Sequence, residues 1–214
     1  MKILYNKIDK KVIQELPRVL FEGRIFVIQT EAEANKAVSY LKGFPVLGVD
    51  TETRPAFRKG QVNKVALLQV STDDTCFLFR LNRIGLPDSV VSLFQDKDTV
   101  KVGLSLRDDI ASLHKRGDFE PQSFVELQTY VRDFGIEDMS LQKLYANLFG
   151  QKISKGQQLT NWEADVLSEN QMRYAATDAW ACVKIYRELE LLKVTNDYEL
   201  QIVPGVLPND TETK

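Results

Sequence analysis

Cysteine and long apolar runs are scarce in this 214-residue sequence. Its two cysteines, Cys76 and Cys182, cannot form a disulfide framework, which favours a reducing compartment. No apolar run approaches the length of a membrane span, and the amino-terminal segment MKILYNKIDKKV is too charged for a signal peptide. We therefore expect a cytoplasmic protein without membrane association, and nothing in the sequence indicates an obligate protein partner.

An excess of positive charge is also missing. The formal net charge is −2, which excludes a protein that coats nucleic acid generally but leaves local binding possible. Hydrophobic residues make up 43% of the chain and charged residues 27%, enough for one well-packed α/β domain. We expect an amino-terminal arm at residues 1–23, a single domain at residues 24–200 and a fraying carboxy-terminal tail at residues 201–214.

Hydrophobic periodicity predicts a mixed α/β fold. Strands are expected at residues 24–29, 46–52, 64–71, 75–80, 100–104 and 123–127, and helices at residues 31–42 and 88–95. The three strands between residues 46 and 80 are too closely spaced for crossover helices, so they should form an antiparallel meander. Strands and helices then alternate, which permits parallel pairing, and the chain beyond residue 128 is expected to be largely helical.

The apolar run at residues 46–49 ends abruptly at two acidic residues. In the segment VLGVDTET, strand alternation places Asp50 and Glu52 on one side, about 7 Å apart, and turns Thr51 away. Two carboxylates so placed could bind one hard cation, and they would repel each other without it. A strand that simply becomes polar at the surface is the alternative for this segment alone.

A second acidic pair follows the strand expected at residues 100–104. In the helix expected after it, Leu106, Ile110 and Leu113 define an apolar stripe. Asp109 lies about 65° from the centre of this stripe and Asp108 about 165° away. Asp109 is therefore the acid expected to face inward, although a helix cap or an ion pair would also explain it.

A third motif lies on a long helix that begins after Ser168. Ser168 and Gln171 form a capping box, and helical periodicity continues for several turns. Tyr174 and Asp178 are four residues apart, so they share a face among small residues that allow close packing. An aspartate paired with a buried arginine, with Tyr174 as an ordinary core residue, is the alternative.

Together these motifs resemble the DEDD superfamily of 3′–5′ exonucleases in its tyrosine-bearing branch, and within it most closely ribonuclease D and the exonuclease domain of the Werner-syndrome helicase. The resemblance covers residues 24–192 and rests on GVDTET, KVGLSLRDDIASL and NWEADVLSENQMRYAATDAWACVKIYREL. It implies a ribonuclease-H-like fold, in which a mixed sheet of an antiparallel meander plus parallel strands carries helices on both faces. The related branch has a histidine in its third motif, whereas the single histidine of this chain, His114, lies outside that motif.

The resemblance also implies a reaction: hydrolysis of DNA or RNA from the 3′ end with release of nucleoside 5′-monophosphates, using two divalent ions. Asp50 would bridge both ions, and Glu52 and Asp178 would complete the shell of the ion that holds the attacking water. Asp109 would help to hold the other ion through water, and Tyr174 would orient or deprotonate the attacking water. Oxygen-only ligands fit Mg²⁺ or Mn²⁺ and argue against zinc.

Substrate contacts are less well specified by the sequence. Basic residues near the acids could guide a nucleic-acid backbone, and aromatic residues could stack on terminal bases. Met139 and Leu141 occupy positions where the family builds part of its 3′-end pocket, although leucines at helical spacing commonly just pack. Trp162 has a second interpretation as core beneath the last helix. The candidate contacts are Thr51, Arg54, Lys59, Met139, Leu141, Lys155 and Trp162.

Two other function classes stay open at this point. One is a catalytically silent, nuclease-like module that binds nucleic acid or serves as a scaffold. The other is a metal-dependent phosphatase acting on small nucleotides, which shares the ion chemistry but has no motif of its own here.

Overall fold

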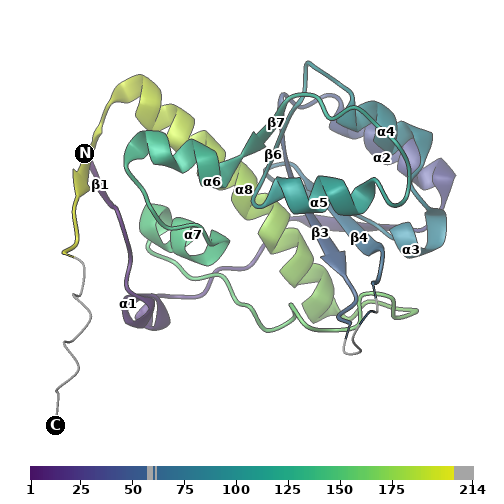
Figure 1. The fold of residues 1–214 in the computed structure, drawn as a ribbon, viewed down its shortest axis with the longest axis horizontal. Coiled ribbons are helices and arrows are strands. Elements are labelled where there is room, and N and C mark those ends of the chain that lie inside the picture. The colour runs from purple at the N-terminus through teal and green to yellow at the C-terminus, as the bar shows by residue number, and fades with distance from the viewer. Residues whose placement is uncertain (57–59, 61, 205–214) are drawn as a thin grey trace, which may run out of the picture.

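A six-stranded mixed sheet is the centre of the fold in the computed structural model, which describes residues 1–56, 60 and 62–204 (Figure 1). Its order is β2-β5-β4-β3-β6-β7. The strands are β2 (Arg24–Ile28), β3 (Val46–Thr53), β4 (Val65–Ser71), β5 (Thr75–Phe79), β6 (Val100–Gly103) and β7 (Phe124–Glu126). Antiparallel pairing joins β3, β4 and β5, while β2 runs parallel to β5 and β6 runs parallel to both β3 and β7. The predicted meander and the change to parallel pairing are confirmed.

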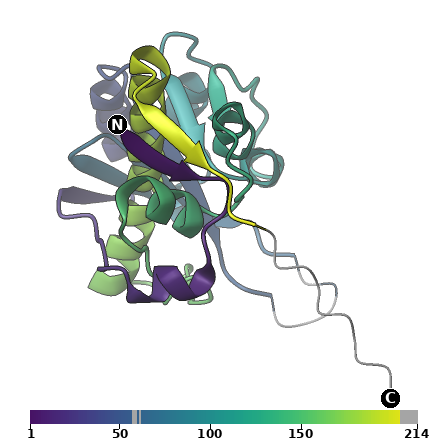
Figure 2. The ribbon, with the colours of Figure 1, turned by 90° about the vertical axis from the view of Figure 1, so that its left-hand side faces the viewer.

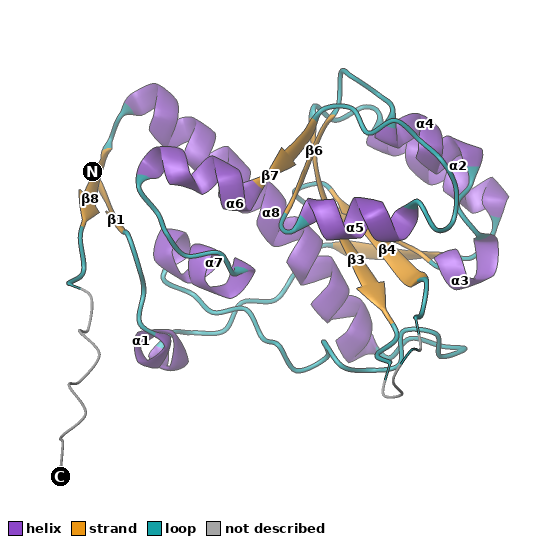
Figure 3. Cartoon of the chain, in the orientation of Figure 1, coloured by secondary structure: helices purple, strands orange, loops and turns teal. Residues whose placement is uncertain are grey.

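Helices cover both faces of this sheet, as expected (Figure 3). The helices of the described residues are α1 (Lys10–Glu15), α2 (Glu31–Leu41), α3 (Leu81–Ile84), α4 (Asp88–Phe94), α5 (Leu106–Leu113), α6 (Leu127–Tyr130), the 3-10 helix η1 (Val131–Phe134), α7 (Leu141–Phe149) and α8 (Glu169–Thr195). Helices α2, α4 and α5 share one hydrophobic core with the sheet, and α8 packs on the opposite face. None of the helices in the described residues is both long and apolar enough to cross a membrane.

Alternation along β3 assigns its side chains to these two layers. Leu47 and Val49 are buried in the core formed with α2, α4 and α5. The alternating positions Gly48, Asp50 and Glu52 face α8, because successive strand side chains point to opposite faces. At Gly48 a Cβ would lie only 1.9 Å from the carbonyl oxygen of Ala179, so glycine is required for α8 to approach this closely. The last helix therefore lies directly against the strand that carries the first two acids.

Local capping signals are confirmed for two helices. Ser168 forms the expected capping box with Gln171, and Thr30, the residue before the helix expected at residues 31–42, forms a second one with Glu33. Each box satisfies backbone groups that the first helical turn leaves without partners. These helix starts depend only on neighbouring residues, which is why the sequence predicts them well.

A small parallel sheet at the chain ends was not expected. Strand β1 (Lys2–Tyr5) pairs with β8 (Tyr198–Gln201), and the two lie side by side in Figure 2. Leu4 is fully buried in the core that also contains residues of α7 and α8. The first residues thus pack against the last described strand, although the sequence indicated only an amino-terminal arm there. Most of the predicted tail, residues 205–214, lies outside the described residues.

Candidate active site

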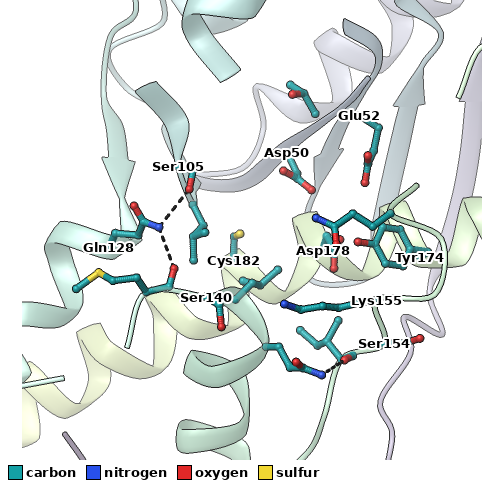
Figure 4. A pocket seen from close by; sticks show the side chains of 17 residues that line it. Asp50, Glu52, Ser105, Gln128, Ser140, Ser154, Lys155, Tyr174, Asp178 and Cys182 are labelled. Atoms are coloured by element: carbon teal, nitrogen blue, oxygen red, sulfur yellow. Dashed lines mark hydrogen bonds between the residues drawn. The ribbon is translucent and has the colours of Figure 1, made fainter. Parts of the chain in front are cut away.

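Three of the four predicted carboxylates meet at one place. Asp50 and Glu52 project from β3 toward α8, and Asp178 projects from α8 toward β3 (Figure 4). One carboxylate oxygen from each residue lies within 4.8 Å of the other two. Three oxygen donors carrying negative charge at this spacing suit a hard divalent cation such as Mg²⁺ or Mn²⁺.

Burial and mutual repulsion dominate the electrostatics of this cluster. Burial, with repulsion from Asp178 and Asp109, raises the pKa of Glu52 from 4.5 to about 9. Burial and the charge of Asp178 likewise raise the pKa of Asp50 well above its usual range. Burial raises the pKa of Asp178 to about 7, and a hydrogen bond from Tyr174 and the charge of Lys155 oppose that rise. A cation bound among these carboxylates would relieve the repulsion between them.

Tyr174 lies one helical turn before Asp178 on α8. It is largely buried, and it sits at the edge of the acidic cluster (Figure 4). Burial and the neighbouring charge of Asp178 raise the pKa of its hydroxyl. A raised pKa favours a neutral phenol, so Tyr174 is better suited to donating a hydrogen bond than to acting as a phenolate base.

Asp109 stands apart from the three clustered acids. The predicted orientation of the second pair is confirmed, because Asp108 is exposed and Asp109 is partly buried. Thr51 faces the α5 side of the sheet, and its hydroxyl donates to Asp109 Oδ1 at 2.5 Å. Burial raises the pKa of Asp109 to about 6, and the Thr51 hydrogen bond opposes this. Asp109 thus reaches the site from the opposite side of β3, close enough for its charge to raise the pKa of Asp50.

Sequence reasoning missed Glu126, which fixes the start of α5. Its carboxylate accepts hydrogen bonds from the backbone N–H groups of Ser105, at 3.0 Å, and Leu106, at 2.7 Å. Ser105 itself has a φ of 62° and provides no side-chain cap. Glu126 therefore replaces the missing cap and holds the helix that carries Asp109. No local pattern links these residues, because Glu126 lies at the end of β7, 21 positions after Ser105 and 20 after Leu106.

A cavity of about 380 Å³ opens beside the acids. Asp50, Glu52, Tyr174 and Asp178 line one part of it, and the other walls come largely from α7 and the segments before and after it (Figure 4). The Gln128 side-chain amide donates to Ser105 Oγ at 3.2 Å and to the Met139 carbonyl oxygen at 2.8 Å, which ties two walls together. Among the predicted substrate contacts, the structure brings to this cavity Thr51, Met139, Leu141 and Lys155.

Two other predicted contacts, Trp162 and Arg54, are not part of the cavity lining that the described residues form. Trp162 is fully buried, so its ring is not available for a base to stack on. Its ring lies 6.1 Å from that of Tyr174, and its second interpretation, as core beneath the last helix, is confirmed. Arg54 is exposed and pairs with Glu163 at 3.3 Å. Lys59 lies outside the described residues.

Comparisons with known proteins agree with this geometry. A family model described as 3′-5′ exonuclease matches residues 25–192. The chain is 32% identical over 196 residues to a 3′-5′ exonuclease of Arabidopsis thaliana, covering 83% of this chain and 67% of the relative. It is 30% identical over 194 residues to the bifunctional 3′-5′ exonuclease/ATP-dependent helicase WRN of Mus musculus, covering 85% of this chain but only 14% of that protein.

Solved structures share the fold. The Aedes aegypti Nibbler EXO domain superposes with a TM-score of 0.73 at 22% identity, covering 83% of this chain and 92% of that one. Escherichia coli RNase D superposes with a TM-score of 0.72 at 19% identity, covering 80% of this chain and 46% of that one. The mixed sheet and its helices are therefore the architecture that these nucleases use.

Proposed function

Because the chain belongs to the 3′–5′ exonuclease family, we propose that it hydrolyses phosphodiester bonds at the 3′ end of a nucleic acid and releases nucleoside 5′-monophosphates. The observation that supports this most strongly is the convergence of Asp50, Glu52 and Asp178 from two elements at the wall of one cavity. A structural neighbour, Trypanosoma brucei RNase D, is known in complex with RNA U12. For this chain we propose 3′ ends of DNA or RNA as the substrate class.

The donor set fits two divalent ions, Mg²⁺ or Mn²⁺. Asp50 would be shared by both ions, Glu52 and Asp178 would serve one, and Asp109 would serve the other. Every one of these donors is a carboxylate. The carboxylates repel one another, and bound cations would offset that repulsion. When bound, the ions would neutralise charge on the phosphate and make water more acidic.

The chain's own side chains would position the reactants. The raised pKa of Tyr174 favours the protonated hydroxyl, which can orient the attacking water beside Asp178. Lys155 lines the cavity near the acids and can contact a phosphate of the substrate. Met139 and Leu141 line another part of the cavity and can pack against the terminal nucleoside.

The proposal is tested with substrates labelled at the 5′ end. Single-stranded, recessed and blunt DNA, and RNA of matching sequence, are incubated with the protein and Mg²⁺ or Mn²⁺. We expect products that shorten stepwise from the 3′ end, with nucleoside 5′-monophosphates released. Asp50→Asn should abolish shortening, whereas Asp108→Asn, which changes an exposed neighbour of Asp109, should leave it intact. Absence of shortening on every substrate by folded protein would refute the proposal and favour a silent module.

A further inference from the structure

Gln69 is a polar side chain in a position that otherwise suits an apolar one. It lies in β4 and is fully buried, as are its neighbours Leu67, Leu68 and Val70. Among the described residues, neither its Nε2 nor its Oε1 has a hydrogen-bond partner. A buried amide without partners is unfavourable, so its presence calls for a functional reason.

The sheet register places Gln69 directly opposite Asp50. The two residues are partners in the antiparallel pair of β3 and β4, so their side chains lie on the same face. On its other side Gln69 pairs with Leu78 of β5. Along β4 the same face carries Leu67 and Ser71, and the Ser71 hydroxyl already donates to a backbone carbonyl at 2.9 Å. Asp50 is therefore the charged side chain immediately beside the amide.

The other strand neighbours of Gln69 on this face, apart from Ser71, are apolar. Leu67 and Leu78 pack in one buried cluster with Ala175 and Ala176 of α8. These four residues are all fully buried. In such surroundings a hydrogen bond from an amide to a carboxylate is stronger than it would be in water.

We propose that Gln69 is a positioning residue whose Nε2 donates a hydrogen bond to the Asp50 carboxylate when Asp50 binds divalent cations. This inference rests on the proposed function. The glutamine side chain has three torsions, so its amide can turn toward the opposite strand. A carboxylate shared between two ions must keep a fixed orientation, and hydrogen bonds from neighbouring residues provide it. A neutral donor does this without adding a positive charge that would compete with the cations.

Gln69→Met tests the proposal, because it removes the amide and keeps nearly the same volume. Leu68→Met is the matched control, since it changes the adjacent buried residue, whose side chain points to the other face. Mn²⁺ affinity is measured by titration with detection of free Mn²⁺ by electron paramagnetic resonance, and stability by urea unfolding. We expect Gln69→Met to weaken Mn²⁺ binding by about 10- to 100-fold without lowering the unfolding midpoint, and Leu68→Met to bind normally.

A second measurement uses the wild-type protein and so does not depend on the folding of a variant. With glutamine labelled with ¹⁵N, the side-chain amide resonances of Gln69 should shift when Mg²⁺ saturates the site. This inference would be overturned if these resonances do not move, or if Gln69→Met binds Mn²⁺ as tightly as the wild type does. The proposed function would stand in that case as long as the wild-type protein shows exonuclease activity. A wild-type protein that neither binds Mn²⁺ nor shortens nucleic acid would overturn the proposed function and this inference with it.

Discussion

Neutralising Glu52 should stabilise the protein in the absence of divalent cations. Its pKa is raised from 4.5 to about 9, mainly by burial. Between these values the folded state binds more protons than the unfolded state, so the free energy of unfolding falls as the pH rises. At pH 7.5 the wild type lies three pH units above the pKa of the unfolded state, and each unit is worth about 1.4 kcal/mol. Keeping this buried carboxyl protonated in the folded state therefore lowers the free energy of unfolding, and Glu52→Gln removes that loss. We expect the free energy of unfolding of the variant to exceed that of the wild type by up to about 4 kcal/mol at pH 7.5 and by less than about 1 kcal/mol at pH 5.

Urea unfolding in EDTA at pH 5 and pH 7.5 measures this difference. Asp108→Asn provides the control, because it removes one negative charge at an exposed position and should change stability little at either pH. Adding Mg²⁺ should raise the unfolding midpoint of the wild type more than that of Glu52→Gln, because the variant has lost one ligand. Equal or lower stability of Glu52→Gln at pH 7.5 in EDTA would refute the view that this carboxylate is buried at an electrostatic cost.

Three further predictions concern the residues around the acids. Tyr174→Phe removes only the orienting hydroxyl, so it should lower kcat by roughly 10- to 100-fold in a steady-state nuclease assay. Its thermal unfolding midpoint should stay within a few degrees of that of the wild type. An unchanged kcat would argue against the orienting role of the hydroxyl. Trp162→Ala should destabilise the protein by about 3–5 kcal/mol in urea unfolding because the ring is fully buried, and a small loss would contradict its place in the core. Glu126→Ala should lower the free energy of unfolding by about 1–3 kcal/mol, because the N–H groups of Ser105 and Leu106 lose their acceptor. If the rates of amide hydrogen exchange at those two positions do not change, the carboxylate does not cap α5.

Local patterns explain why much of the fold was predictable. The strands near residues 46–80 follow from short apolar runs with brief connections, and these connections leave little choice but an antiparallel meander. The starts of α2 and α8 follow from capping boxes within four residues of sequence. In the same way, helical spacing places Tyr174 and Asp178 on the same face of α8, and strand alternation places Asp50 and Glu52 on the same face of β3.

Contacts between distant segments could not be predicted in this way. Strand β1 pairs with β8 from the other end of the chain, so neither has a local signal that specifies its partner. Trp162 could have been a surface aromatic or a core residue, and only the packing of α8 and the sheet decided that it is core. The capping of α5 by Glu126 likewise depends on β7 lying beside β6.

The sequence by itself determined the identity of the acids, their order and the element that carries each one, because strand and helix periodicity are properties of neighbouring residues. Only the tertiary structure decided that Asp50, Glu52 and Asp178 form one cluster while Asp109 is held by Thr51. It also placed Gln69 opposite Asp50. The packing of whole helices and strands sets the distances across the sheet and the depth to which each side chain is buried. Distance and burial in turn set the pKa values of the acids, so local propensity does not determine them.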